Sequence, residues 1–292
     1  MRESFLKYLQ FEKRYSKHTI ISYETDLLQF EAHLTNFSQE AEISNITYRD
    51  IRSWIADLVE DKLSPNSINR KIASLRSYYK FLMKQGLIDK DPTEKIQALK
   101  TSKRLPSFIS EDNIVDLLDN CEFPNDFTGQ RDRLIFELLY GTGIRLSELI
   151  NLKVSDINFI QRNIKVLGKR NKERIIPFPG SLENTIYQYL NLSSAFRSAD
   201  TNYLLIKDDG NQCYPMIIYR TIRKYLPIFT TIEKRSPHVL RHTFATHLLN
   251  KGAELNAVKD LLGHSSLAAT QVYTHNSLDK LKKVFDQAHP KA

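Results

Sequence analysis

One stretch of the chain, from 236 to 275, concentrates side chains that can bind and transform a phosphate group. It reads SPHVLRHTFATHLLNKGAELNAVKDLLGHSSLAATQVYTH. Ser236-Pro237 is typical of a helix start, because proline at the first helical position loses no hydrogen bond and serine can cap free amides. His238 and Arg241 would then neighbour each other near the positive end of that helix. Such a pair suits a bound phosphate, although taken alone it is more often a structural histidine and a surface arginine.

A second arginine stands in apolar surroundings within the segment 141–150, which reads GTGIRLSELI. Arg145 follows a glycine-containing break and precedes a short helix for which Ser147 is the expected cap. A guanidinium among isoleucines and leucines is costly to bury unless an anion or a carboxylate meets it. Glu148 is the candidate partner, and it either pairs with Arg145 or orients that arginine toward a ligand.

The clearest strand signal lies at 163–178, where NIKVLG and ERIIPF flank the polar connection KRNK. Alternation of apolar and other residues around a short polar connection predicts an antiparallel β-hairpin. The expected tip of the hairpin carries three basic residues, Lys169, Arg170 and Lys172. Taken alone, they are typical of a solubilising loop; beside the arginines they can also face a phosphate.

The elements that position these groups belong to a chain of 292 residues with a net charge of +8. That length allows two domains of ordinary size, and 41% hydrophobic residues are normal for a globular protein. The positive charge favours a polyanionic partner such as nucleic acid. Two cysteines in unrelated contexts predict neither a disulfide framework nor a metal site. Without a signal-peptide core or an apolar run of membrane-spanning length, we expect a soluble, cytoplasmic protein with no membrane contact.

Apolar periodicity predicts a mainly α-helical fold with a small antiparallel sheet. We expect a helical N-terminal domain at 1–98, a basic linker at 99–107 and a second domain at 108–292. A helix over 45–60 should bury the single tryptophan, Trp54. In the second domain, helical patterns lie at 111–120, 181–192, 215–229, 239–251 and 254–262, with a buried helix in RDRLIFELLYGTG.

The most informative N-terminal segment is 64–86, where Ser64 and Pro65 mark a helix start. One face of this helix is an apolar stripe made of Ile68, Ile72, Leu75, Tyr79 and Leu82. The other face and its flank carry the basic residues Arg70, Lys71, Arg76, Lys80 and Lys84. Because no acidic residue lies between 66 and 86, we expect this basic face to follow a DNA phosphate backbone. The alternative is a merely solvated face. Lys103 and Arg104 in the linker are further candidates for DNA contact.

Five separate segments resemble the sequence boxes of the tyrosine recombinase (phage integrase) family, in the family's order. TGIRLSEL is similar to its first arginine box, VLGKRNKERIIPF to its lysine hairpin, and SPHVLRHTFATHLL to its HxxR box. LLGHSS and QVYTH are similar to its second histidine box and its nucleophile box. FEKRYSKHTIISYETDL also resembles the family's helical, SAM-like core-binding domain. Length and wording are most similar to the Xer recombinases; one departure is Arg170, where the hairpin usually has glycine.

This resemblance implies a site-specific DNA recombinase that forms a 3′-phosphotyrosyl intermediate. Two guanidiniums can clamp the non-bridging phosphate oxygens, and a phenol is a tolerable nucleophile and a good leaving group. His238 would act as general base, His264 would add a hydrogen bond, and Lys169 would protonate the departing 5′ oxygen. The implied catalytic set is Arg145, Lys169, His238, Arg241, His264 and the nucleophile Tyr273, supported by Glu148.

The covalent link conserves bond energy, so no cofactor, neither ATP nor a metal, is implied. His238, His242 and His247 lie at helical intervals, but no HExxH motif or cysteine cluster completes a metal site. We expect His242, His247 and His275 to be structural or to face DNA, and Tyr78 and Tyr79 to be packing residues.

The implied partner is double-stranded DNA with a specific recombination site, bound by a homo- or heterotetramer. A C-terminal helix at about 277–288 would dock into a neighbouring subunit, or else fold back on its own domain. A sister Xer recombinase and an FtsK-type DNA translocase are implied for chromosome dimer resolution. Alternatives are an integrase or transposase of a mobile element, a DNA-inversion recombinase, a relaxing topoisomerase, and a non-catalytic DNA-binding protein.

Overall fold

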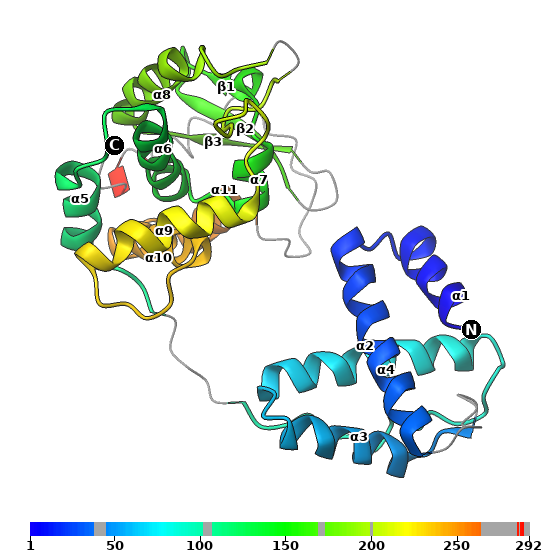
Figure 1. The fold of residues 1–292 in the computed structure, drawn as a ribbon. Helices are drawn as coiled ribbons and strands as arrows, with labels where there is room; N and C mark the ends of the chain where they lie inside the picture. The colour runs from blue at the N-terminus through cyan, green and yellow to red at the C-terminus, as the bar shows by residue number, and fades with distance from the viewer. Residues whose placement is uncertain are drawn as a thin grey trace. The chain divides into compact units, whose positions relative to one another are not determined.

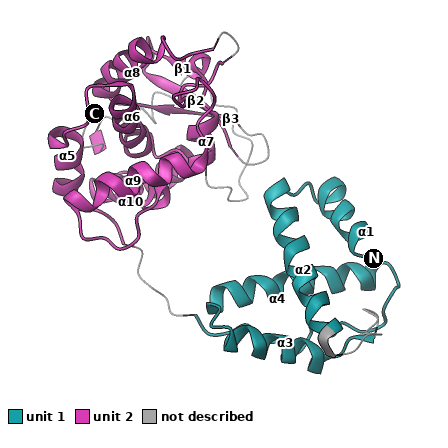
Figure 2. Cartoon of the chain, in the orientation of Figure 1, with its two compact units in different colours: residues 1–104 teal, residues 105–292 magenta. Residues whose placement is uncertain are grey.

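The computed structural model describes residues 1–37, 45–101, 107–168, 173–198 and 201–263, together with 285, 287 and 288. The chain divides into two compact units, Met1–Arg104 and Leu105–Ala292 (Figure 2). Each unit has a hydrophobic core of its own. The boundary between them falls within the linker expected at 99–107. The predicted mainly helical fold with a small antiparallel sheet is confirmed (Figure 1).

Unit 1 is helical throughout its described elements. They are α1 (Arg2–Lys7), a π-helical turn η1 (Tyr8–Glu12), α2 (Lys17–Phe37), α3 (Tyr48–Glu60) and α4 (Pro65–Lys84). The predicted start of α4 is confirmed, because Ser64 accepts a hydrogen bond from the Ser67 amide and Pro65 occupies the first turn. All five residues of its apolar stripe are buried, as is Trp54.

The start of α3 differs from the expected helix over 45–60. The helix begins at Tyr48, because Thr47 has an extended backbone and serves as the N-cap. The carboxylate of Asp50 accepts a hydrogen bond of 2.8 Å from the Thr47 amide and so stops the helix from extending further back. The aromatic residues of α4 behave as predicted, since Tyr78 and Tyr79 are buried in the core of unit 1.

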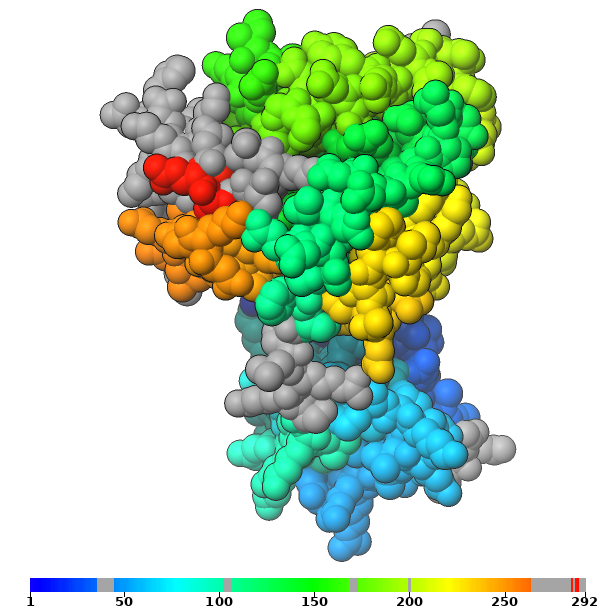
Figure 3. Space-filling model, turned by 90° about the vertical axis from the view of Figure 1, so that its left-hand side faces the viewer, coloured from blue at the N-terminus to red at the C-terminus, as the bar shows by residue number. Residues whose placement is uncertain are grey.

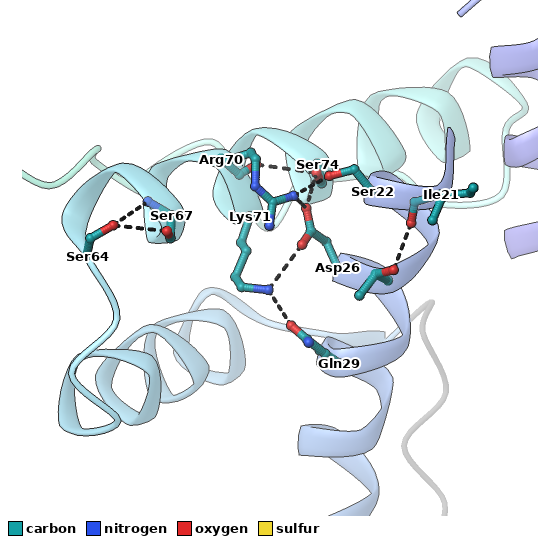
Figure 4. Close-up of polar contacts among 10 residues, drawn as sticks. Ile21, Ser22, Asp26, Gln29, Ser64, Ser67, Arg70, Lys71 and Ser74 are labelled. Carbon is teal, nitrogen blue, oxygen red and sulfur yellow. Dashed lines mark hydrogen bonds and ion pairs between the residues drawn. The ribbon is translucent and has the colours of Figure 1, made fainter. Parts of the chain in front are cut away.

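A buried carboxylate joins α2 to α4 (Figure 4). Asp26, fully shielded from solvent, accepts hydrogen bonds from Arg70, from Lys71 at 3.1 Å and from the Ser74 hydroxyl at 2.7 Å. Lys71 also donates to the Gln29 side chain. A charged group in the interior requires such partners, because an unpaired buried charge costs several kcal/mol.

This cluster corrects the expected basic face of α4. Lys71 was predicted to contact DNA, but only 5% of its side chain is exposed and its ammonium points at Asp26. The prediction for Lys71 is therefore wrong in this structure. Arg70 is half-exposed and also bonded to Asp26, and Arg76 donates to the Ile96 carbonyl. The acidic partner of Arg70 and Lys71, Asp26, lies on α2. The sequence of α4 alone therefore does not reveal it.

Unit 2 is built around one buried helix, α6 (Phe127–Thr142), which packs against several neighbours (Figure 1). Its other helices are α5 (Glu111–Asn120), α7 (Leu146–Asn151), the short 3₁₀ turn η3 (Val154–Asp156), α8 (Gly180–Ser193), α9 (Pro215–Phe229), α10 (Pro237–Asn250) and α11 (Leu255–Leu262). The helical patterns expected between 111 and 262 are confirmed, with ends that shift by no more than two residues except at α6, which begins four residues before the expected segment RDRLIFELLYGTG.

The sheet of unit 2 has the order β1-β2-β3 and is antiparallel. Its strands are β1 (Ile157–Asn158), β2 (Asn163–Leu167) and β3 (Glu173–Pro177). The predicted hairpin is confirmed, with Ile164 opposite Ile176 and Val166 opposite Arg174. Its tip, with Lys169, Arg170 and Lys172, lies outside the described residues.

The described part of the C-terminal segment packs on unit 2 of the same chain. Phe285 and Ala288 are buried in the core of this unit, and the Phe285 ring lies 6.4 Å from that of Phe244, between centroids. Figure 3 shows the described C-terminal residues in red, beside the orange atoms of the α10–α11 region. The positions of these two residues agree with a C-terminal segment that folds back on its own domain. Docking of this segment into a neighbouring subunit stays a prediction. Across the described parts of the chain, no helix combines the length and apolar character that crossing a membrane requires.

We predict that Asp26→Ala destabilises unit 1 by about 3–5 kcal/mol, because it leaves the buried Lys71 ammonium without its carboxylate. Trp54, the only tryptophan, lies in unit 1, so its fluorescence during urea unfolding follows this unit selectively. Asp89→Asn at an exposed aspartate is the control and should shift stability by no more than about 0.5 kcal/mol. Equal shifts in the two variants would contradict the role given to Asp26.

Candidate active site

Arg145 sits at the point where the chain enters α7. It is the N-cap of that helix, and its backbone amide donates a 2.7 Å hydrogen bond to Glu148 Oε2. Its guanidinium donates to Glu148 Oε1 at 2.8 Å. The expected cap at Ser147 is therefore wrong, because the Glu148 carboxylate satisfies the first amide instead. The predicted partnership of Arg145 and Glu148 is confirmed.

Arg241 reaches the same region from α10. Pro237 occupies the first turn of that helix as predicted, but the Ser236 side chain does not cap it. The buried Arg241 guanidinium donates to the carbonyls of Gly143 and Leu262. Gly143 ends α6 with φ +60°, and a Cβ there would come within 2.4 Å of the Phe244 ring. The bend that presents the Gly143 carbonyl therefore requires glycine.

The C-terminal end of α11 gathers the arginines. Three successive carbonyls each accept a hydrogen bond from a different guanidinium: Leu261 from Arg174, Leu262 from Arg241, and Gly263 from Arg145. Helix ends expose unpaired carbonyls at the negative pole of the helix dipole, so cations are stabilised there. The two arginines predicted to clamp phosphate thus converge immediately before residue 264.

Arg174 is a member of this cluster that the sequence reasoning missed. It donates to both oxygens of Glu148, at 2.7 and 2.8 Å, and its side chain is only 4% exposed. The strand pattern contained a signal: Arg174 occupies a position two residues from Ile176, on the buried face of β3. A basic residue at an inward position of a strand indicates a buried partner.

The charges of the cluster shift two pKa values. Burial alone would raise the pKa of Glu148, but hydrogen bonds and charge from Arg174, and then from Arg145, outweigh it and lower that pKa to about 2. Burial, followed by the positive charges of Arg145 and Arg174, lowers the pKa of Arg241. Two guanidiniums therefore bind one carboxylate and a third lies near it, and the excess positive charge favours an anion at this place.

The remaining predicted residues divide into two groups. His238 lies in the first turn of α10, exposed, one helical turn before Arg241. Two groups of predicted residues lie outside the described residues. From the expected catalytic set and its surroundings these are Lys169, His264, Tyr273 and His275. From the expected DNA contacts these are Lys103, Arg104, Arg170 and Lys172. The structure thus brings Arg145, Glu148 and Arg241 together and places His238 on the helix of Arg241.

Another histidine of α10 has protein groups as its hydrogen-bond partners. His247 is buried; its Nδ1 lies 3.0 Å from the Tyr140 hydroxyl and its Nε2 lies 2.9 Å from the Ile109 carbonyl. Burial lowers the pKa of His247, as expected for a structural, neutral imidazole. Among the described residues, no group of three or more histidine, cysteine and acidic side chains can hold a metal ion.

Comparison with known proteins assigns both units. The profile of the Phage integrase family matches residues 107–279, and the profile of the phage integrase N-terminal SAM-like domain matches residues 3–86. The chain is 39% identical to the tyrosine recombinase XerC of Staphylococcus carnosus, over 100% of this chain and 98% of the relative. It is 36% identical to the tyrosine recombinase XerD of Staphylococcus haemolyticus, over 99% and 98% of the two chains.

Solved structures share the fold. A XerH site-specific recombinase bound to a palindromic difH substrate matches with a TM-score of 0.73 at 21% identity, covering 97% of this chain and 83% of that one. The integrase of transposon Tn1549, in complex with circular intermediate DNA, matches with a TM-score of 0.72 at 21% identity, covering 96% and 97% of the two chains.

Fold, site and comparisons together define a class of enzymes that cleave and rejoin DNA through a tyrosine. The chain belongs to the phage integrase family of tyrosine recombinases.

We predict that Glu148 makes unit 2 sensitive to acid. Its pKa of about 2, against an ordinary value of 4.5, means that the folded protein binds this proton less readily than the unfolded chain. The ionised carboxylate therefore contributes about 3 kcal/mol to the free energy of unfolding of unit 2 above pH 4.5, and this contribution is lost as the pH falls toward 2. The difference in unfolding free energy between wild type and Glu148→Gln should shrink over this range.

Circular dichroism checks this prediction, with Trp54 fluorescence reporting unit 1 as an internal reference. Glu122→Gln, at an exposed glutamate, is the matched control and should show a small difference that does not change with pH. A Glu148→Gln difference that stays constant between pH 7 and pH 3 would show that the carboxylate is not held by the arginines.

Proposed function

We propose that this chain is an Xer-type site-specific recombinase that cuts and rejoins DNA strands through a 3′-phosphotyrosyl intermediate, in chromosome dimer resolution. The observation that carries the proposal is the convergence of two guanidiniums from distant helices. Arg145 and Arg241 donate to adjacent carbonyls, those of Gly263 and Leu262. The full-length likeness to XerC and XerD supports the Xer role.

In the proposed reaction, the two arginines bind the non-bridging oxygens of the scissile phosphate. A phosphodiester resists attack because its charge repels nucleophiles, and fixed guanidiniums stabilise the charge that develops in the transition state. Tyr273 attacks phosphorus through its phenol oxygen, and His238 accepts its proton. Lys169 protonates the departing 5′ oxygen, and His264 donates a hydrogen bond to the phosphate. A free 5′-hydroxyl then attacks the phosphotyrosine and releases Tyr273.

The exposed position of His238 supports its proposed role, because a general base must be reachable by the nucleophile and by solvent. It lies one helical turn from Arg241, so a phosphate held by that arginine would lie near the imidazole. No step of this scheme uses a metal ion or ATP, because the phosphotyrosine link conserves the energy of the broken phosphodiester.

The proposed partner is double-stranded DNA with a specific recombination site, bound by a tetramer. The XerH and Tn1549 structures of the same fold were solved with DNA. Relatives named XerC and XerD both align with the whole chain, which supports pairing with a sister recombinase; an FtsK-type translocase would act with that pair. We place the reaction in the cytoplasm, with its DNA.

Each unit has a proposed task. Residues 1–98 form the core-binding domain, 99–107 the linker and 108–292 the catalytic domain, with an exchange helix at about 277–288. The proposed DNA contacts are Arg70, Arg76, Lys80, Lys84, Lys103, Arg104, Arg170 and Lys172. Lys80 and Lys84 are exposed on α4, which supports their assignment. Lys71 is left out because Asp26 holds it in the interior.

We predict that Tyr273→Phe abolishes the covalent DNA adduct while leaving DNA binding within about twofold of wild type. The phenylalanine ring lacks the attacking oxygen but retains the size of tyrosine. The measurement is a gel assay with a nicked suicide substrate that traps the adduct on wild-type protein. An adduct at wild-type level on Tyr273→Phe would falsify this assignment of the nucleophile. No adduct on wild type with tight DNA binding would favour a non-catalytic DNA-binding protein.

We also predict that α4 contributes phosphate contacts through Lys80 and Lys84. The logarithm of DNA affinity should fall linearly with the logarithm of salt concentration, and each lost contact should reduce the slope by about 1. We therefore expect the double variant Lys80→Ala/Lys84→Ala to show a slope smaller in magnitude by about 2 in a fluorescence anisotropy titration. Lys7→Ala/Lys90→Ala, at two exposed lysines outside α4, is the control and should keep the wild-type slope.

A further inference from the structure

We propose that Arg174 is a positioning residue for the phosphate clamp: it fixes the Glu148 carboxylate and the end of α11, and through them the guanidinium of Arg145. This inference rests on the proposed function, in which Arg145 binds the scissile phosphate. Arg174 itself is buried from solvent, with 4% of its side chain exposed, so it acts through other residues and not on DNA.

The first step of the argument is that every nitrogen of the Arg174 guanidinium has an acceptor. Nε donates to the Leu261 carbonyl at 2.8 Å, and the two terminal nitrogens donate to the two oxygens of Glu148 at 2.7 and 2.8 Å. Two parallel bonds to one carboxylate fix its plane as well as its position. A lysine ammonium at this place cannot reproduce that planar fork.

The second step is that the same carboxylate holds Arg145. Glu148 Oε1 accepts from the terminal nitrogens of both arginines, and Oε2 accepts from the Arg145 backbone amide and from Arg174. Arg145 is the N-cap of α7, so the carboxylate sets both its side chain and its backbone. Rotation of the Glu148 carboxylate would therefore move the Arg145 guanidinium directly.

The third step concerns the other acceptor of Arg145. Its second terminal nitrogen donates to the Gly263 carbonyl at 2.8 Å. The stem and guanidinium of Arg174 lie against this same glycine: a Cβ at Gly263 would be 3.1 Å from Arg174 Cδ and 3.2 Å from its Nε. Arg174 thus contacts both groups to which the Arg145 guanidinium is anchored, the Glu148 carboxylate and the turn at Gly263.

The placement of Arg174 also connects parts of the chain that must act together. It is the second residue of β3, directly after the hairpin tip at 169–172. Its bond to Leu261 reaches the helix that precedes residue 264. One buried side chain therefore ties the hairpin strand, α7 and α11 into one frame around the arginines.

The experiment measures single-turnover cleavage of a nicked suicide substrate by full-length Arg174→Lys and Arg174→Met. Small displacements of a catalytic group cost on the order of 10²-fold in rate. We expect the cleavage rate constant to fall by about 10- to 100-fold, more for Met than for Lys, with DNA affinity within about twofold of wild type. Arg131→Lys is the matched control, because Arg131 is equally buried and also bonds a carbonyl, that of Ile206, away from Glu148.

A pH profile separates positioning from simple stabilisation. The charged groups facing Glu148 are Arg145 from α7, Arg174 from β3 and Arg241 from α10. Without Arg174, burial raises the pKa of Glu148 and fewer hydrogen bonds oppose it. The cleavage rate of Arg174→Met should therefore fall off on the acid side at a pH where wild type and Arg131→Lys show no such loss.

Two results would overturn the proposal. One is an Arg174→Met protein that unfolds at lower temperature but cleaves at the wild-type rate, with the wild-type pH profile, below its transition. The other is equal loss of cleavage in Arg131→Lys and Arg174→Lys. If Arg174→Met does not fold, the test rests on Arg174→Lys. Its cleavage rate constant is then compared with that of Arg131→Lys. Failure of wild type to form an adduct would contradict the proposed function itself, and so is distinguishable from both results.

Discussion

The site depends on one constraint: three guanidiniums must be held close together although their charges repel. Two features of the fold offset this repulsion between the guanidiniums. Glu148 supplies the negative charge, and the C-terminal carbonyls of α11 supply the negative pole of a helix. Because Arg145, Arg174 and Arg241 come from α7, β3 and α10, their meeting point exists only when all of these elements pack on α6 and its neighbours. The core of unit 2 is therefore a condition for the charge arrangement.

Unit 1 also compensates buried charges, but with a different set of partners. There one buried carboxylate, Asp26, is shared by Arg70, Lys71 and Ser74, and the result joins α2 to α4. In unit 2 three basic groups, Arg145, Arg174 and Arg241, lie around one carboxylate. Asp26 faces two basic side chains, of which Arg70 is half-exposed to solvent, whereas Glu148 lies among three arginines. The larger positive excess around Glu148 is what favours an anion.

Glycines and carbonyls matter as much as charged side chains here. Gly143 and Gly263 both have left-handed backbones, and each presents a carbonyl to an arginine of the cluster. A side chain at either position would meet Phe244 or Arg174. The arginines are therefore aimed by backbone geometry that only glycine adopts without strain.

The sequence by itself determined the local elements and the family, because helix starts, apolar stripes and motif spacing are local properties. Ser64-Pro65, the hairpin around 168–172 and the arginine boxes are of this kind. Only the tertiary structure decided which charges pair. Lys71 was expected on the surface but lies inside, since its partner Asp26 is on another helix. Arg174 was overlooked because its role depends on Glu148, and β3 meets α7 only in the folded chain. Electrostatic partners are set by packing between distant segments, which periodicity along one segment cannot encode.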